Sequence, residues 1–365
     1  MQQKNTKYAN VINWINENIS SGILKVGDKL NSENELSRMF GLSRQTVRHA
    51  IDILEQQKVL VRVQGSGTYI GSVKKAVRKE KYRNIAVIST YVDGYIFPST
   101  IKGIEDVLSG HGYMTQIAFT NDSVSREYNI LESLIAADNI DGLIVEPAKS
   151  ALPNPNIHYY EIMADRGIPV IFFNANYPEL NMPCVRLDDE EVSYKAVRYL
   201  LEQGHRKTAG IFKSDDGQGH LRYAGFVRAL REAGIAIEDR HVVWIDSEDL
   251  INLEEIMDYL KRRFTGCSAV MCYNDEVAYQ IISMFGKEKI PEVFSVIAID
   301  NSDLAEYADV PFTSFPHPKE KLGRKVAENM VRLIENPDYD ANYMFDADIV
   351  TRDSVKDLTK DKAEE

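Results

Sequence analysis

The chain has 365 residues, more than one ordinary domain needs, and 44% of them are hydrophobic, as is usual for a water-soluble protein. No apolar run approaches the roughly 18 residues that span a bilayer, and the N-terminus lacks the apolar core of a secretion signal. The three cysteines show no metal-binding spacing and fit a reducing compartment. We therefore expect a cytoplasmic protein that does not associate with membranes.

The charge is divided unevenly along the chain. Residues 1–83 hold 15 Lys and Arg against 7 Asp and Glu, a net charge of +8, whereas the remainder has a net charge of −20 and the whole chain −12. This division indicates two domains with different partners. A basic segment fits a nucleic-acid-binding surface or a solvated basic face, and charge alone does not separate the two.

Breaks in the sequence pattern indicate where the domains begin and end. The stretch SVKKAVRKEKYR is charged and lacks apolar periodicity, which is typical of a linker. The C-terminal residues are also mostly charged. We predict an N-terminal domain over 1–71, a linker over 72–83, a second domain over 84–350 and a flexible tail over 351–365.

Helical patterns fill most of the first 57 residues. An amphipathic helix is predicted within residues 7–20 from the apolar stripe of Val11, Trp14, Ile15 and Ile19. Ser32 and Glu35 then have the spacing of a capping box, which begins a second helix, and Gly41 ends it. Ser43 caps a third helix with an apolar inner face and a polar outer face. Two helices joined by a tight turn predict a helix-turn-helix, whose second helix enters the major groove of DNA.

The stretch QGSGTYIG, residues 64–71, nearly matches a phosphate-binding fingerprint. Gly65 and Gly67 have the G-x-G spacing, but Ile70 stands where the third glycine belongs. In a dinucleotide-binding fold such glycines follow a strand and open a helix, whereas here they separate the short apolar segments VLVRV and TYI. The pattern favours a β-hairpin over a nucleotide-binding loop.

Residues 29–70, KLNSENELSRMFGLSRQTVRHAIDILEQQKVLVRVQGSGTYI, resemble the winged helix-turn-helix of the GntR family of regulators. The resemblance implies operator DNA as a partner, with the recognition helix in the major groove and the hairpin wing near the minor groove. Arginine pairs well with guanine and glutamine with adenine, so the outer face of the third helix suits base recognition. The DNA-binding residues expected are Glu33, Arg38, Ser43, Arg44, Gln45, Thr46, Arg48, Gln64, Gly65 and Gly67.

Residues 84–350 alternate between short apolar segments and longer segments with helical spacing. The apolar segments are 84–89, 141–146, 168–173, 208–212, 268–273 and 294–299. Continuous apolar runs are typical of strands buried on both faces, and their alternation with helices predicts a parallel α/β sheet. The length of this region fits two similar lobes better than one sheet.

Polar side chains follow these predicted strands, where open α/β sheets bind ligands. A sugar needs planar polar groups for its hydroxyls and an apolar wall for its C–H face. Phe97 and Phe315 suit such a wall or a core position equally. A cap or loop hydrogen bond is the alternative at each polar position. The effector-binding residues expected are Tyr91, Tyr95, Glu146, Lys149, Asn174, Arg222, Asn274, Asp275, Asp300 and His317.

The acidic run DDEE, residues 188–191, could suggest a metal site. It directly precedes a segment with helical spacing, and acidic residues are favoured at the N-terminus of a helix. We therefore predict a helix start there and no metal site.

Several stretches of the second domain resemble the sugar-sensing domain of the lactose/galactose-repressor family, among them VRYLLEQGHRKTAGI, AVMCYNDEVAY and SVIAIDNSDLAEYADVPFTSF. That resemblance implies a two-lobed fold like the periplasmic sugar-binding proteins. A GntR-type head on such a domain, with DGLIVEPAKSAL and GIFKSDDGQG, is similar to the AraR family of arabinose-responsive repressors. This similarity implies a homodimer that leaves palindromic operators when L-arabinose binds, without a further cofactor.

The sequence leaves three alternatives to this function. A repressor that responds to another pentose or small polyol has the same sequence features. An α/β enzyme with a basic head is less consistent, because no G-x-S-x-G, P-loop or H-E-x-x-H motif is present. A transport-type sugar-binding protein would need a secretion signal and would not need the N-terminal head.

Overall fold

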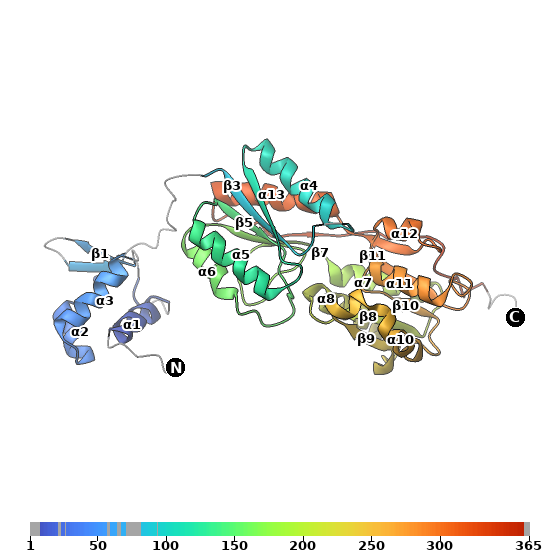
Figure 1. Cartoon of the computed structure of the whole chain (residues 1–365). Helices are drawn as coiled ribbons and strands as arrows, with labels where there is room; N and C mark the ends of the chain where they lie inside the picture. Colours follow the sequence, from blue (N-terminus) through green and yellow to red (C-terminus); the bar gives the residue numbers. More distant parts are fainter. Residues whose placement is uncertain are drawn as a thin grey trace. The chain divides into compact units, whose positions relative to one another are not determined.

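The computed structural model describes residues 8–20, 23–25, 27–56, 59–63, 67–70, 82–92 and 94–360. The chain divides into two compact units, Met1–Arg78 and Lys79–Glu365. This division falls within the predicted linker, of which residues 72–81 lie outside the described residues. Figure 1 shows the elements of each unit. Nowhere in the described ranges is a helix long and apolar enough to cross a membrane.

The first unit has the predicted winged helix-turn-helix. Its described elements are α1 (Ala9–Ser20), α2 (Glu33–Phe40), α3 (Arg44–Gln56), β1 (Leu60–Val63) and β2 (Gly67–Ile70). The capping box begins α2, because the Ser32 hydroxyl accepts from the Glu35 amide and the Glu35 carboxylate accepts from the Ser32 amide. Gly41 ends α2 in the left-handed conformation. The Ser43 hydroxyl accepts from the Thr46 amide at 3.2 Å and caps α3.

The apolar faces of this unit meet in one core. β1 and β2 form an antiparallel pair, and Ile70 of β2 is 2% exposed. A strand that packs on the helices in this way cannot open a helix, which excludes the dinucleotide fold at this position. The buried core residues are Val11, Ile15, Leu30, Leu36, Val47, Ala50, Ile51, Leu54, Leu60 and Ile70.

The second unit contains two parallel sheets, one in each lobe. The first lobe has the strand order β13-β7-β6-β5-β3-β4, and the second lobe has the order β12-β11-β10-β8-β9. The strands of the first lobe are β3 (Asn84–Ser89), β4 (Met114–Phe119), β5 (Gly142–Val145), β6 (Val170–Phe173), β7 (Cys184–Leu187) and β13 (Tyr343–Phe345). Those of the second lobe are β8 (Thr208–Lys213), β9 (Val242–Ile245), β10 (Ala269–Met271), β11 (Ser295–Asp300) and β12 (Thr313–Pro316).

Helices cover both faces of each sheet (Figure 1). In the first lobe, α4 (Phe97–Gly110) and α13 (Lys319–Glu335) pack on one face, and α5 (Val124–Ala137) and α6 (Ile157–Asp165) on the other. In the second lobe, α7 (Asp189–Glu202) and α8 (Gly217–Glu232) pack on one face. The other face carries α10 (Met257–Arg263), α11 (Asp275–Phe285) and α12 (Asp303–Tyr307), and the short helix α9 (Ser247–Ile251) follows β9.

The chain passes between the lobes three times. It leaves the first lobe after β7, returns between β12 and α13, and leaves again after β13. Parallel strands in both lobes place their carboxyl ends at one edge of each sheet, and these edges carry the residues that line the cavity between the lobes. The predicted two-lobed α/β fold is therefore confirmed.

All six strands predicted from apolar runs are found, as β3, β5, β6, β8, β10 and β11. The sequence did not reveal β4, β7, β9, β12 and β13. Four of these five are the outermost strands of their sheets, which have a neighbour on one side only. β4 shows the consequence: its residues are exposed or half-buried, so they need not be continuously apolar.

The prediction of a flexible tail from residue 351 is wrong for residues 351–360, which pack on the second lobe. Ser354 is fully buried, accepts from the Thr313 amide at 2.9 Å and donates to the Val296 carbonyl at 2.6 Å. The Leu358 amide donates to the Gln203 carbonyl. The charged residues of this segment made it look solvated, but its small and apolar residues provide partners for strand ends of the second sheet. Residues 361–365 lie outside the described residues.

We expect Ser354→Ala to lower the free energy of unfolding of the second unit by about 1–3 kcal/mol, because two buried backbone groups lose their partner. Thr359→Ala is the control, since Thr359 is exposed and its hydroxyl donates to the nearby half-buried Asp357. Urea unfolding can be followed by Trp244 fluorescence in a Trp14→Phe background, which removes the only other tryptophan. Equal midpoints for the two variants would show that the Ser354 hydroxyl contributes nothing to stability.

Candidate functional site

A cavity of about 410 Å³ lies between the lobes of the second unit. Its walls come from the segments that follow β3, β4, β5 and β6 in the first lobe and β8, β9, β10 and β11 in the second. This volume lies within the roughly 300–1,000 Å³ range typical of small-molecule clefts. Eight of the ten predicted effector-binding residues line it: Tyr91, Tyr95, Glu146, Lys149, Asn174, Arg222, Asn274 and Asp300.

Arg222 lines this cavity and is 1% exposed. It donates to Asp189 at 2.8 Å, to the Tyr273 carbonyl at 2.6 Å and to Asp300 at 3.4 Å. Asp300 also accepts from the Tyr95 hydroxyl, which comes from the other lobe. Burial raises the pKa of Asp300, while Arg222 and Tyr95 oppose that rise by favouring its carboxylate. Burial likewise raises the pKa of Asp189 to about 6, against the opposing effect of Arg222.

A second group of polar side chains lies on the first-lobe wall. The buried Glu146 carboxylate accepts from the Thr90 amide and hydroxyl, from the Ser89 hydroxyl and from Asn174 Nδ2 at 2.6 Å. Burial raises the pKa of Glu146, and these donors limit the rise. Asn174 Oδ1 lies 2.9 Å from His317 Nε2. The nitrogen and the oxygen of the Asn174 side-chain amide therefore each have a hydrogen-bond partner, which fixes the orientation of this amide in the cavity wall.

The remaining wall residues differ in what they leave available to a ligand. Asn274 caps α11 through its oxygen, which accepts from the Val277 amide at 3.0 Å, and its Nδ2 donates to Glu276. Tyr91 packs edge-on against Phe97, with ring centroids 5.4 Å apart, and both line the cavity. These two rings supply the apolar surface expected of a sugar site. The ammonium of Lys149 is bound by Asp215 at 2.9 Å.

Two predicted effector residues do not line the cavity, and one candidate wall residue is in the core. Asp275 is fully buried and accepts from Ser302 and Ser314, so it holds the segment after β11 in place. His317 contacts the side chain of Asn174, which lines the cavity, but does not line the cavity itself. Phe315 packs in the core between the second sheet and α7. These residues do follow strands, where open α/β sheets bind ligands. Their position in the sequence did not indicate whether their side chains face the cavity or the core.

Four further polar residues of the cavity wall lie at strand ends but were not predicted from the sequence. Lys213 and Asp216 end and follow β8, Ser247 follows β9, and Asp122 follows β4. The first two could have been found from the apolar run 208–212, because they come directly after it. Asp122 and Ser247 follow edge strands that the sequence did not reveal.

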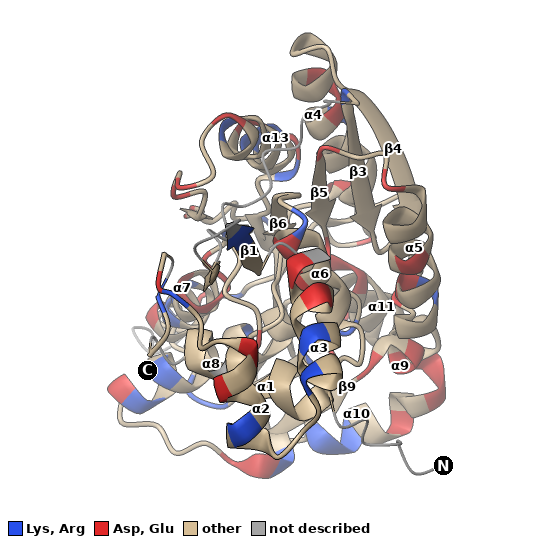
Figure 2. Cartoon of the chain, turned by 90° about the vertical axis from the view of Figure 1, so that its left-hand side faces the viewer, with Lys and Arg blue, Asp and Glu red and all other residues tan. Residues whose placement is uncertain are grey.

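The helix-turn-helix presents the predicted recognition face. Arg38, Ser43, Arg44, Gln45 and Arg48 are exposed, and Thr46 is half-buried. Figure 2 shows the basic positions on α2 and α3. The opposite face of α3 is buried in the core, so the arginines and the glutamine point away from it. This arrangement matches a recognition helix that enters the major groove.

Glu33 and Arg48 form a pair across α2 and α3. Arg48 Nε and its terminal amine both donate to the Glu33 carboxylate, at 2.7 Å for the shorter contact with the amine. The hydrogen bond from Arg48 is the main reason that the pKa of Glu33 is lowered. Glu33 therefore orients Arg48. A carboxylate would be repelled by DNA phosphate, so direct phosphate contact by Glu33 is disfavoured.

The wing is described only in part. Gly67 has a φ of 131°, which side-chain-bearing residues rarely adopt, and a β-carbon there would lie 2.7 Å from Lys29 Cε. This geometry explains why glycine is needed at the start of β2. Gln64 and Gly65, the other two wing residues predicted to contact DNA, lie outside the described residues.

The acidic run 188–191 begins α7, as predicted. The Asp188 carboxylate accepts from the Glu191 amide at 3.1 Å and caps the helix. Glu190 and Glu191 both bind Arg228 of α8. Each carboxylate of the run thus has a role in the helix start or in the pairing of α7 with α8.

Comparison with known proteins matches the two units to different families. Residues 7–70 match the model of bacterial regulatory proteins of the gntR family, and residues 197–355 match that of the periplasmic binding protein-like domain. The solved structure of the transcription regulator CcpA of Lactococcus lactis superposes with a TM-score of 0.67 at 22% identity. The superposition covers 75% of this chain and 99% of the CcpA chain, and it supports the two-lobed fold of the second unit.

Two curated relatives match almost the whole chain. The arabinose metabolism transcriptional repressor of Halalkalibacterium halodurans is 37% identical over 98% of both chains. The protein of the same name from Geobacillus stearothermophilus is 33% identical over 95% of this chain and 96% of its own. These matches favour a regulator over the enzyme and transport alternatives. The chain therefore belongs to the family of arabinose metabolism transcriptional repressors.

Proposed function

We propose that this protein represses genes of L-arabinose utilisation by binding palindromic operators as a homodimer, and that L-arabinose bound in the interlobe cavity releases it. One observation carries the proposal: a polar cavity at the strand ends of two lobes is joined, in one chain, to a helix-turn-helix head, and this chain aligns from end to end with an arabinose metabolism repressor. A two-fold homodimer would present two heads to the two halves of a palindrome.

The cavity has the groups that a pentose requires. We infer that Asp300 and Glu146 accept from sugar hydroxyls, because both are buried carboxylates on the cavity wall. Arg222 and Asn174 would donate to hydroxyl oxygens. The rings of Tyr91 and Phe97 would cover the C–H face of the sugar. Donors and acceptors that are already oriented by neighbouring side chains lose little entropy when the ligand binds.

Release of DNA by the sugar follows if the sugar favours a lobe arrangement that binds operator weakly. Because such coupling is reciprocal, operator DNA must weaken sugar binding by the same factor. A sugar in this cavity would contact both lobes, so it would stabilise their closed arrangement. We infer that this change in the lobes is what the dimer transmits to its heads.

A repressor that responds to another pentose or to a small polyol is the second candidate. The wall residues are general hydroxyl-binding groups, and their types alone do not select one stereoisomer. Thermal-shift measurements with a panel of pentoses and polyols separate the candidates, because a ligand raises the melting temperature according to its affinity. The largest shift should come from L-arabinose.

We expect Arg44→Ala to weaken operator binding by about 1–3 kcal/mol, because a bidentate contact between arginine and a guanine base contributes about this much free energy. Arg240→Ala is the control: it removes an equal charge from an exposed site in the second unit, where Arg240 pairs with Glu238. Fluorescence anisotropy at one fixed salt concentration, on DNA selected by the wild-type chain, gives both affinities. If the two variants weaken binding equally, Arg44 contributes only net charge.

We expect Asp300→Asn to weaken L-arabinose binding at least about tenfold, because hydrogen bonds to a charged acceptor contribute roughly 1.5–3 kcal/mol. Operator affinity should be unchanged, and the DNA complex should no longer dissociate when the sugar is added. Isothermal titration calorimetry measures the first quantity and anisotropy the second. Glu306→Gln, on the exposed face of α12, is the matched control. Loss of both activities would assign Asp300 to the fold instead.

A further inference from the structure

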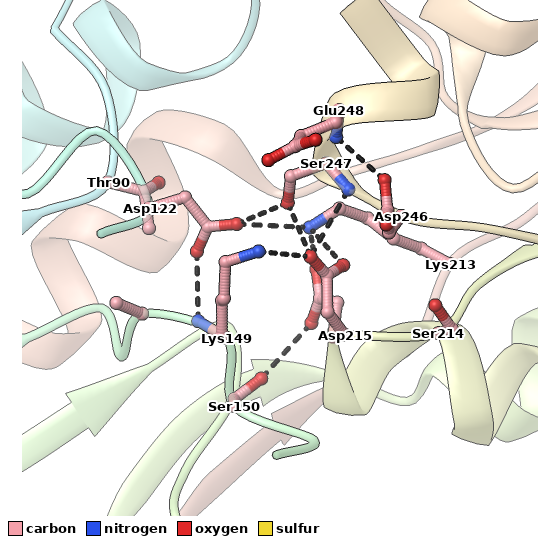
Figure 3. Close-up of polar contacts among 12 residues, drawn as sticks. Thr90, Asp122, Lys149, Ser150, Lys213, Ser214, Asp215, Asp246, Ser247 and Glu248 are labelled. Atoms are coloured by element: carbon pink, nitrogen blue, oxygen red, sulfur yellow. Dashed lines mark hydrogen bonds and ion pairs between the residues drawn. The ribbon is translucent and has the colours of Figure 1, made fainter. Parts of the chain in front are cut away.

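Two ion pairs cross between the lobes at the edge of the cavity (Figure 3). Lys149, from the segment after β5 in the first lobe, binds Asp215 of the second lobe at 2.9 Å. Lys213, at the end of β8 in the second lobe, binds Asp122 of the first lobe at 3.4 Å. Each lobe therefore contributes one lysine and one aspartate, so the charges of the two lobes are complementary.

Hydroxyl groups join the two pairs into one network. Ser247 Oγ lies 2.5 Å from Asp122 Oδ2 and 2.7 Å from Asp215 Oδ2, so it links carboxylates from opposite lobes. Ser150 adds a further connection, because its hydroxyl accepts from the Gly217 amide at 2.9 Å and donates to Asp216 at 3.2 Å. Figure 3 shows the side chains of the network pointing toward one another from segments of both lobes, with Asp122, Lys149, Ser150, Lys213, Asp215 and Ser247 labelled.

The network is largely shielded from water. The side chains of Asp215, Asp122 and Lys213 are 3%, 7% and 9% exposed, and that of Lys149 is 30% exposed. Burial disfavours the charged forms, but the opposite charges outweigh it: the pKa of Asp215 falls to about 2. Lys213, which also lies 3.2 Å from Asp215, has a raised pKa for the same reason. The pKa of Lys149 is raised as well, mainly by its hydrogen bond to Asp215.

This arrangement makes the network sensitive to lobe separation. When the lobes part, each charge regains water and loses its partner from the other lobe, so desolvation and the interlobe attraction largely offset one another in the intact network. When Lys149 is removed, the closed arrangement loses an attraction between the lobes, whereas Asp215 and Lys213 still pair within the second lobe whether the lobes are closed or open. A single neutral substitution therefore penalises the closed arrangement and leaves the open one unaffected.

We propose that Asp122, Lys149, Lys213 and Asp215 form an interlobe clamp that sets how often the lobes are closed, and through it the affinity for the effector. The second part of this proposal depends on the proposed function, because it requires a sugar that binds the closed lobes. The four residues act as positioning residues: they hold the two walls of the cavity together. A direct contact with the sugar is the competing role for the two lysines, since both line the cavity.

The test compares Lys149→Met with a matched control, Lys356→Met. Lys356 pairs with Glu292 at 3.2 Å within the second lobe, and its side chain is 31% exposed, close to the 30% of Lys149. Spin labels at Ala136→Cys on α5 and Lys261→Cys on α10 report the distance between the lobes in the full-length chain. Both positions are exposed, and a Cys267→Ser background leaves only two buried native cysteines.

We expect Lys149→Met to broaden the interlobe distances without sugar and to weaken L-arabinose binding about tenfold, because apparent affinity falls with the fraction of binding-competent molecules. Lys149→Arg should restore both, and Lys356→Met should change neither. Asp122→Asn should act like Lys149→Met, and asparagine tolerates the left-handed backbone at this position, where φ is 55°.

Two outcomes would overturn the clamp. If Lys149→Met weakens sugar binding but leaves the distances unchanged, Lys149 is a ligand contact alone. If Lys356→Met broadens the distances equally, the effect is a general loss of stability. Failure of the proposed function is distinguishable from both: the wild-type chain would then bind no L-arabinose, while Lys149→Met would still broaden the interlobe distances and support the clamp.

Discussion

The cavity depends on one buried charge, the guanidinium of Arg222. It binds Asp189 at the start of α7, the Tyr273 carbonyl after β10 and Asp300 at the end of β11, and so ties together three segments of the second lobe. Removing one partner of a buried ion pair costs about 3–5 kcal/mol, so these contacts restrict how the strand ends can be arranged. Asp300, held in this way, then meets Tyr95 from the first lobe.

Close helix packing brings these charges together. A β-carbon on Gly225 of α8 would lie 2.1 Å from the Glu190 carbonyl of α7, so only glycine lets these helices approach so closely. This contact places Asp189 of α7 beside Arg222 of α8. Gly219 has a similar role, because a β-carbon there would lie 2.0 Å from the Lys213 carbonyl. The start of α8 therefore sits directly on the end of β8, where the interlobe ion pairs begin.

The sequence predicted elements whose physics is local, and it missed those that depend on partners far along the chain. The capping box of Ser32 and Glu35 lies within one helical turn, and β3 and β11 are buried on both faces and therefore continuously apolar. The ion pair of Asp122 and Lys213 joins residues 91 positions apart in two lobes. No spacing rule connects such positions, and Asp122 also follows an edge strand without an apolar run.

His317 shows how a residue outside the cavity can matter to it. The Lys319 amide donates to His317 Nδ1, so the ring proton is on Nε2 and is donated to Asn174 Oδ1. Burial lowers the pKa of His317 to about 3, and the ring stays neutral near physiological pH. His317 lies on the segment that crosses between the lobes from β12 to α13. A ligand bound to Asn174 would therefore be connected through His317 to a segment that crosses between the lobes. The interlobe ion pairs lie at the edge of the same cavity. Asn174 and the interlobe ion pairs therefore both join segments that a change in lobe separation would move, so a ligand that favours one lobe arrangement would act on both.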